Sequence, residues 1–236
     1  MNQSFHILFK SYTDSDPMGK LIFFLLLILS ILCWAVIAWK GLLYFRIKRI
    51  GASNMSLIEN PRDGILSLTL PPSAGFGVYQ ELFEKMKSKA LKLLEKNQYF
   101  SSQEAHQVFL SKDDLELIGE DLHASIAKTM KQVDSGLFIL YNLTSLSPFV
   151  GILGTVWGIL ICLFEMQKGS QTLSSSLIIQ GLSTALGTTV IGLLIAIPAL
   201  ISYALLKNQS KGIALHLNLY AKEMLTHLEL QYKKVN

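Results

Sequence analysis

Three stretches of this 236-residue sequence contain no Asp, Glu, Lys or Arg: 21–39, 137–164 and 170–206. A helix needs roughly 20 apolar residues to cross the hydrocarbon core of a bilayer, so each stretch is long enough for one crossing. Half of all residues are hydrophobic and 16% are charged, an apolar excess that a soluble domain of this length does not need. The sequence therefore predicts an all-α integral membrane protein with three transmembrane helices embedded in a lipid bilayer.

The first stretch also invites comparison with a signal peptide, because Lys10 and Lys20 precede it. The apolar core of a signal peptide usually has about 7–15 residues and ends at a small-residue cleavage site. Here the apolar run is longer and leads into Trp39, Lys40 and Tyr44. We expect it to remain in the membrane as an anchor.

Positive charges gather where the first and third stretches end, and such residues favour the cytoplasmic side of a membrane. They are Lys40, Arg46, Lys48 and Arg49 after the first stretch, and Lys207 and Lys211 after the third. The N-terminus is therefore expected outside, and the long segment between the first two stretches inside. The net charge of +4 then follows from topology, and we expect no nucleic-acid partner.

The expected topology divides the chain into seven parts, which follow one another without gaps. They are a short outer N-terminus (1–20), transmembrane helix 1 (21–40), a cytoplasmic helical domain (41–134), transmembrane helix 2 (135–164), an outer loop (165–173), transmembrane helix 3 (174–206) and a cytoplasmic C-terminal helix (207–236).

The expected cytoplasmic domain begins with a segment, 51–77, that is rich in Gly, Pro, Ser and Asn and predicts loops and short turns. Residues 78–96 then place apolar side chains at helical spacing between Glu and Lys, which predicts an amphipathic helix. A second helical run, 101–134, leads into the second apolar stretch with Gly136 as the one interruption. Transmembrane helix 2 is therefore expected to continue into the cytoplasm.

The residues that enzymes and metal sites need do not form a recognisable pattern. The sequence has no glycine-rich phosphate loop and no defensible Ser-His-Asp order, its five histidines are scattered without ligand spacing, and Cys33 and Cys162 lie inside apolar stretches. The acidic cluster between Asp113 and Asp121 is interpreted as a solvated helix face. We expect no enzymatic activity, no metal site and no cofactor.

Small residues recur inside the second stretch, which reads SPFVGILGTVWG from Ser147 to Gly158. Gly151, Gly154 and Gly158 share one helix face, and small residues in membrane helices mark places where backbones approach closely. This face is therefore predicted to be a helix contact. Thr155 lies beside it, and a bond from its hydroxyl to its own helix is one explanation for its presence.

The third stretch carries hydroxyl residues at an unusual density for an uncharged span, namely Ser183, Thr184, Thr188 and Thr189. They favour a crevice that water enters. Its predicted helix contacts are Gly181, Ala185, Gly192 and Ala196. Pro198 removes a backbone donor, so we expect a kink near the cytoplasmic end of this helix.

These two motifs, in this order and with this separation, resemble those of the MotA/TolQ/ExbB proton-channel family. Close similarity covers residues 134–206, and the end of the first stretch, Cys33 to Ile37, is more similar to the TolQ branch than to the ExbB branch. The resemblance implies a bacterial inner-membrane motor subunit, so that "outside" means the periplasm. It also implies a ring, typically a pentamer, around the single span of a TolR-like or ExbD-like partner. Proton entry would drive a TolA-like or TonB-like periplasm-spanning protein.

The resemblance assigns Thr155 and Thr189 to the proton path, and we add Thr184 and Thr188 as candidate lining residues. Thr184 stands where the Tol and Ton branches usually carry a glutamate, so the carboxylate expected to help the proton is missing. A non-conducting scaffold that holds a single-span partner is therefore the alternative. Because neither of the last two stretches contains a carboxylate, histidine or lysine, we expect a partner to supply the titrating acid.

Overall fold

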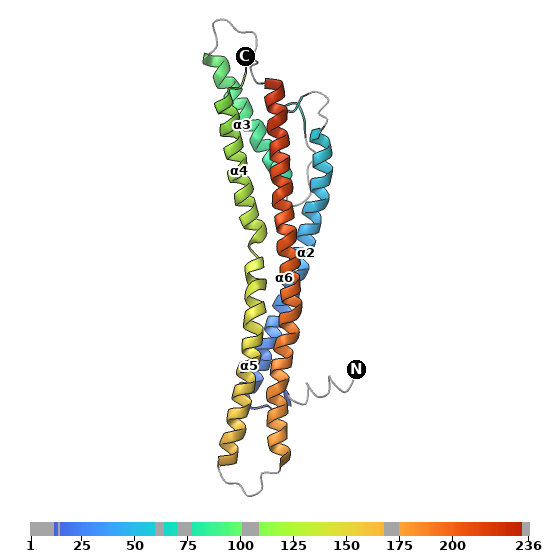
Figure 1. Ribbon diagram of the computed structural model, residues 1–236, viewed down its shortest axis with the longest axis vertical. Helices are drawn as coiled ribbons and strands as arrows, with labels where there is room; N and C mark the ends of the chain where they lie inside the picture. The colour runs from blue at the N-terminus through green and yellow to red at the C-terminus, as the bar shows by residue number, and fades with distance from the viewer. Residues whose placement is uncertain are drawn as a thin grey trace. The chain divides into compact units, whose positions relative to one another are not determined.

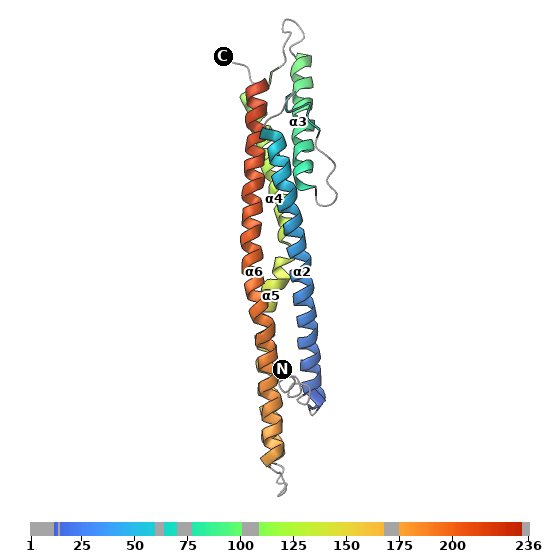
Figure 2. The same cartoon turned by 90° about the vertical axis from the view of Figure 1, so that its right-hand side faces the viewer.

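The computed structural model describes residues 12–13, 15–59, 64–69, 77–100, 109–167 and 175–232. Its helices are α2 (Pro17–Glu59), α3 (Val78–Phe100), α4 (Lys112–Asp134), α5 (Leu137–Gln167) and α6 (Ser175–Tyr232) (Figures 1 and 2). Three helical segments are long and apolar enough to cross a membrane: Pro17–Gly51, Lys112–Phe164 and Gly181–Tyr232. The prediction of an all-α membrane protein with three spans is confirmed.

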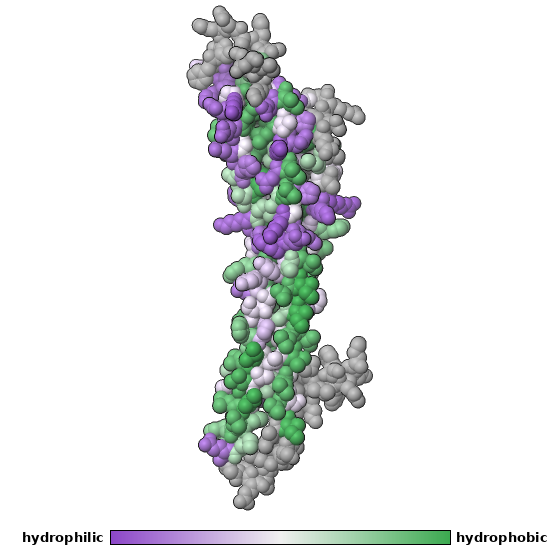
Figure 3. All heavy atoms as spheres, in the orientation of Figure 1, coloured by the Kyte–Doolittle hydropathy of each residue, from purple (hydrophilic) through white to green (hydrophobic). Residues whose placement is uncertain are grey.

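The chain forms two compact units. The first, which we call the membrane unit, comprises Met1–Lys40 and Gly136–Leu206, and the second, the polar unit, comprises Gly41–Ser135 and Lys207–Asn236. On the face shown in Figure 3, the described residues of the membrane unit are mostly hydrophobic, whereas those of the polar unit include many hydrophilic ones. Apolar side chains such as Phe24, Leu153 and Leu194 are exposed on the membrane unit, as expected for helices that face lipid.

Helix α2 begins at an Asp-Pro pair. Asp16 accepts hydrogen bonds from the backbone N–H groups of Met18 (3.2 Å) and Gly19 (3.0 Å), and Pro17 occupies the first helical position, where its missing N–H costs nothing. The helix then continues to Glu59. The prediction of loops from residue 51 onward is therefore wrong for residues 51–59.

A close contact explains why the helix tolerates Gly51. The ring of Tyr79 lies against the Cα of Gly51, where any side chain would collide with it. Packing against α3 therefore stabilises this turn of α2 and outweighs the poor helix propensity of glycine. Residues 64–69 include the predicted turn at Ile65–Ser67, while residues 60–63 and 70–76 lie outside the described part of the chain.

Helix α4 begins at Lys112, after a capping box in which Ser111 and Asp114 exchange side-chain to backbone hydrogen bonds. The predicted helical run is therefore wrong for residues 109–111, and residues 101–108 lie outside the described part of the chain. Partial burial works to raise the pKa of Asp114, but the hydrogen bonds from Asn97 and Ser111 outweigh it and lower that pKa below its ordinary value. Between α4 and α5 the helix is interrupted at Ser135 and Gly136.

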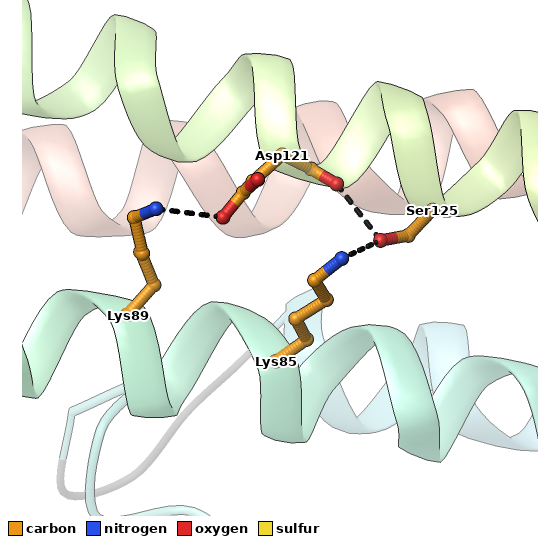
Figure 4. A network of polar contacts seen from close by, with 4 residues as sticks. All are labelled: Lys85, Lys89, Asp121 and Ser125. Carbon is orange, nitrogen blue, oxygen red and sulfur yellow. Dashed lines mark hydrogen bonds and ion pairs between the residues drawn. The ribbon is translucent and has the colours of Figure 1, made fainter.

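Polar contacts and aromatic packing hold the polar unit together. Helices α3 and α4 are joined by Lys89 and Asp121, whose charged atoms are 2.8 Å apart, and by Lys85, which donates to the Ser125 hydroxyl (Figure 4). Tyr79 stacks edge-on against Tyr220 of α6, with ring centroids 5.1 Å apart. Burial raises the pKa of Tyr79. These contacts join α3 to both α4 and α6.

Candidate functional site

The predicted small residues lie where α5 and α6 meet inside the membrane unit, and we call this contact the α5–α6 seam. A Cβ at Gly151 would lie 2.9 Å from the Cα of Thr189, and one at Gly158 would lie 2.7 Å from the Cβ of Ala185. Atoms that close do not occur without a shift of the backbone. The two helices therefore approach to a distance that only glycine permits at these positions.

The remaining glycines extend the seam in both directions. A Cβ at Gly154 would collide with the side chain of Thr188, one at Gly192 would lie 2.6 Å from the carbonyl oxygen of Ser147, and one at Gly181 would collide with the Cys162 sulfur. Ala196 is also buried. The structure thus brings the glycines of both motifs together with Ala185.

Two threonines of α6 share one acceptor on α5. The carbonyl oxygen of Gly151 accepts a hydrogen bond from Thr189 Oγ1 at 2.9 Å and from Thr188 Oγ1 at 3.1 Å. Thr188 also lies 2.6 Å from the carbonyl oxygen of Ala185 in its own helix, and it is 2% exposed. Thr188 therefore sits inside the seam, whereas Thr189 is only partly buried.

Thr155 takes no part in this pair of hydrogen bonds. Its hydroxyl donates to the carbonyl oxygen of Ile152 in its own helix at 2.7 Å, and its side chain is partly exposed. A back-bonded threonine is a common local arrangement, and it leaves the oxygen lone pairs available to another donor. Thr184 lies one turn before Thr188 on α6 and is partly buried.

Pro198 lies within α6, which is helical on both sides of it. Its ring removes one backbone donor and leaves the helix otherwise intact, so the expected kink stays a prediction. The hydroxyl of Ser147, immediately before Pro148, is buried without a hydrogen-bond partner.

A contact that the sequence did not suggest joins the start of α2 to the motif of α5. The indole N–H of Trp157 donates to the Asp16 carboxylate, with 3.0 Å between Nε1 and Oδ2. Asp16 is thus the helix cap of α2 and the acceptor for a residue two positions after Thr155. The predicted topology places Asp16 in the outer N-terminus and anticipates neither the cap nor its contact with Trp157, although Asp followed by Pro is a common start signal of a helix.

The chain that forms the α5–α6 seam is related to known proteins. The chain is a member of the MotA/TolQ/ExbB proton channel family, whose profile matches residues 86–218. The family resemblance is therefore confirmed, and the protein is an inner-membrane protein.

Two of three relatives match most of the chain, and the third matches about half of it. The biopolymer transport protein ExbB of Neisseria meningitidis is 24% identical over 223 residues, which make up 94% of this chain and 96% of that protein. The protein of the same name from Salmonella typhimurium is 27% identical over 198 residues, 84% of this chain and 76% of that protein. The Tol-Pal system protein TolQ of Haemophilus influenzae is 28% identical over 110 residues, 47% of this chain and 48% of that protein. The chain is ExbB-like or TolQ-like, and the preference for the TolQ branch stays a prediction.

Proposed function

We propose that this chain is the proton-channel subunit of an inner-membrane motor that couples the proton motive force to a periplasm-spanning partner. The observation that carries the proposal is the pair of hydrogen bonds from Thr188 and Thr189 to the Gly151 carbonyl. They fix the threonine of one family motif against the glycine of the other, in a chain that belongs to a proton channel family. This arrangement supports the proposal, because it holds the side chains of a proton path in a fixed geometry.

The proposed complex follows from the chemistry that the seam lacks. Threonine hydroxyls position water, but they do not alternate between charged and neutral forms near neutral pH, and relays through membranes generally use ionisable side chains. We therefore propose that copies of this chain form a ring, a pentamer by analogy with the family, around a TolR-like or ExbD-like single-span protein. That protein supplies an Asp near Thr155 and Thr189. A TolA-like or TonB-like protein receives the work.

The test compares this chain alone with the complex that co-purifies from its native membranes. Both are reconstituted into liposomes under a pH gradient, with a trapped pH-sensitive dye. We expect proton flux from the complex and none from the chain alone, and we expect Thr189→Val to abolish the flux while the complex remains assembled. Flux from the chain alone would contradict the proposed source of the acid. A complex that never conducts would contradict the proposed function.

The second candidate function is a non-conducting scaffold, and Thr184 favours it because the family resemblance places a glutamate there. The same assay separates the two. If the missing carboxylate limits conduction, Thr184→Glu raises the flux of the complex. If the complex binds its partners but conducts neither with Thr184 nor with Glu in its place, the scaffold is the better description.

A further inference from the structure

Asp134, the last residue of α4, forms a polar cluster with two residues of α6. Its Oδ2 lies 2.9 Å from the Lys207 ammonium, and its Oδ1 accepts a hydrogen bond from the Ser210 hydroxyl. The side chains of Asp134 and Lys207 are 31% and 41% exposed, while Ser210 is buried. The carboxylate is therefore held in a fixed position and still reaches solvent. All of these residues belong to the polar unit.

Tyr44 of α2 completes the cluster. Its side chain is 1% exposed and its hydroxyl faces Asp134 and Ser210, yet this hydroxyl makes no well-formed hydrogen bond. A buried hydroxyl without a partner is costly and rare in folded proteins, and a water molecule often occupies the missing position. The cluster thus places a buried hydroxyl that lacks a well-formed hydrogen bond beside a carboxylate.

The sequence positions of these four residues, close to the boundaries of the membrane unit, indicate a function for the cluster. The chain leaves the membrane unit after Lys40, enters it again at Gly136 and leaves it after Leu206. Tyr44, Asp134, Lys207 and Ser210 all lie within four residues of one of these points. Asp134 is also the last carboxylate before the second apolar stretch, and the first one after the third stretch is Glu223.

We propose that Asp134 is the proton acceptor at the polar end of the path, with Tyr44, Ser210 and Lys207 as its positioning residues. The inference rests on the proposed function. A proton that arrives on water forms an O–H bond with the Asp134 carboxylate, which leaves the Lys207 ammonium without its anionic partner. The same O–H bond then breaks, the ion pair with Lys207 forms again, and the proton passes to water on the cytoplasmic side. No electrons are transferred.

A purely structural role for Asp134 predicts different mutant behaviour. If Asp134 only anchors α4 to α6, Asp134→Asn and Lys207→Met remove the same ion pair and should have the same effect. A proton acceptor distinguishes them, because only the first substitution removes the carboxylate. Ser210→Ala and Tyr44→Phe each remove a hydroxyl and leave both charges in place.

The experiment measures proton flux of the co-purified native complex in liposomes across a series of pH values. Asp134→Asn is expected to lose most of the flux. Lys207→Met is expected to keep most of the flux, because the Asp134 carboxylate remains in this variant. Equal loss in both variants, or full flux with an unchanged profile in Asp134→Asn, overturns the assignment. Native mass of each complex shows whether it is assembled.

Infrared difference spectroscopy of the full chain gives a second, transport-independent measurement. A pH step is expected to produce a carboxylic acid C=O band, one component of which disappears in Asp134→Asn and shifts in frequency in Tyr44→Phe. A spectrum identical in wild type and Asp134→Asn overturns the assignment even if the complex conducts. A wild-type complex that does not conduct contradicts the proposed function instead, and the infrared result then still shows whether Asp134 takes up a proton.

Discussion

Trp157 of α5 donates its indole N–H to Asp16 at 3.0 Å, across 141 residues of sequence. The same carboxylate accepts the backbone N–H groups of Met18 and Gly19 at the first turn of α2. The Asp16 side chain therefore caps the start of α2 and connects it to the helix that carries Thr155. This hydrogen bond fixes one point of α2 against α5 within the membrane unit.

Trp157→Phe should loosen that attachment. The substitution keeps an aromatic ring and removes the donor, and a hydrogen bond to a charged acceptor is worth about 1.5–3 kcal/mol. We expect a lower midpoint of thermal unfolding for the detergent-extracted protein. Trp34→Phe is the control, since Trp34 is 62% exposed on α2. Equal midpoints for the two variants would show that the Asp16 contact contributes nothing measurable.

Gly154→Leu should disrupt the α5–α6 seam, because a side chain at this position collides with Thr188. The helices must then move apart, so we expect the protein to insert into the membrane but to yield little intact oligomer on native mass measurement. Gly212→Leu is the matched control, since no atom of the described residues lies within 4 Å of a Cβ at that position of α6. An unchanged oligomer in Gly154→Leu would rule out the seam.

The sequence predicts the fold class well because its strongest signals are local. Apolar length predicts the three spans, and the glycine spacing places residues such as Gly151 and Gly158 on one helix face. The end of α2 is not predictable in this way, because the helix is held at Gly51 by Tyr79, a residue from another helix. The cluster around Asp134 is likewise invisible in the sequence, because Tyr44 lies 90 positions before Asp134 and Ser210 lies 76 positions after it, and only folding brings them together.

Thr188 and Thr155 should respond differently to the loss of their hydroxyls. Thr188 is buried and its hydroxyl bridges α5 and α6, so Thr188→Val should lower stability by about 1 kcal/mol. Thr155 bonds only its own helix, so Thr155→Val should leave stability unchanged and abolish flux in the native complex. Denaturant unfolding and the liposome assay measure the two effects. Full flux in Thr155→Val would show that the Thr155 hydroxyl bonds its own helix and has no role in the proton path.

Acid should weaken the polar unit partly through Asp114. Its pKa is lowered in the folded chain by hydrogen bonds that oppose the effect of partial burial, so its contribution is complete above its ordinary unfolded pKa, about 3.9. That contribution is lost as the pH falls through the lower folded value. We therefore expect Asp114→Asn to be less stable than wild type at neutral pH and to lose less on acidification.

The measurement for Asp114 is urea unfolding of the full chain at a series of pH values, followed by the near-ultraviolet signal of the packed tyrosines. Asp113→Asn is the control, because Asp113 is exposed on the same helical turn. Parallel pH curves for wild type and Asp114→Asn would contradict the prediction.

The acceptor at the centre of the α5–α6 seam is a main-chain atom, the carbonyl oxygen of Gly151. Every amino acid supplies that oxygen, so no substitution at position 151 deletes it. What a substitution changes there is volume. The contact therefore depends on a small residue at position 151, and a larger side chain there would force α5 and α6 apart. A contact of this kind is therefore expected to constrain the size of the residue at position 151, because its hydrogen-bond acceptor belongs to the backbone.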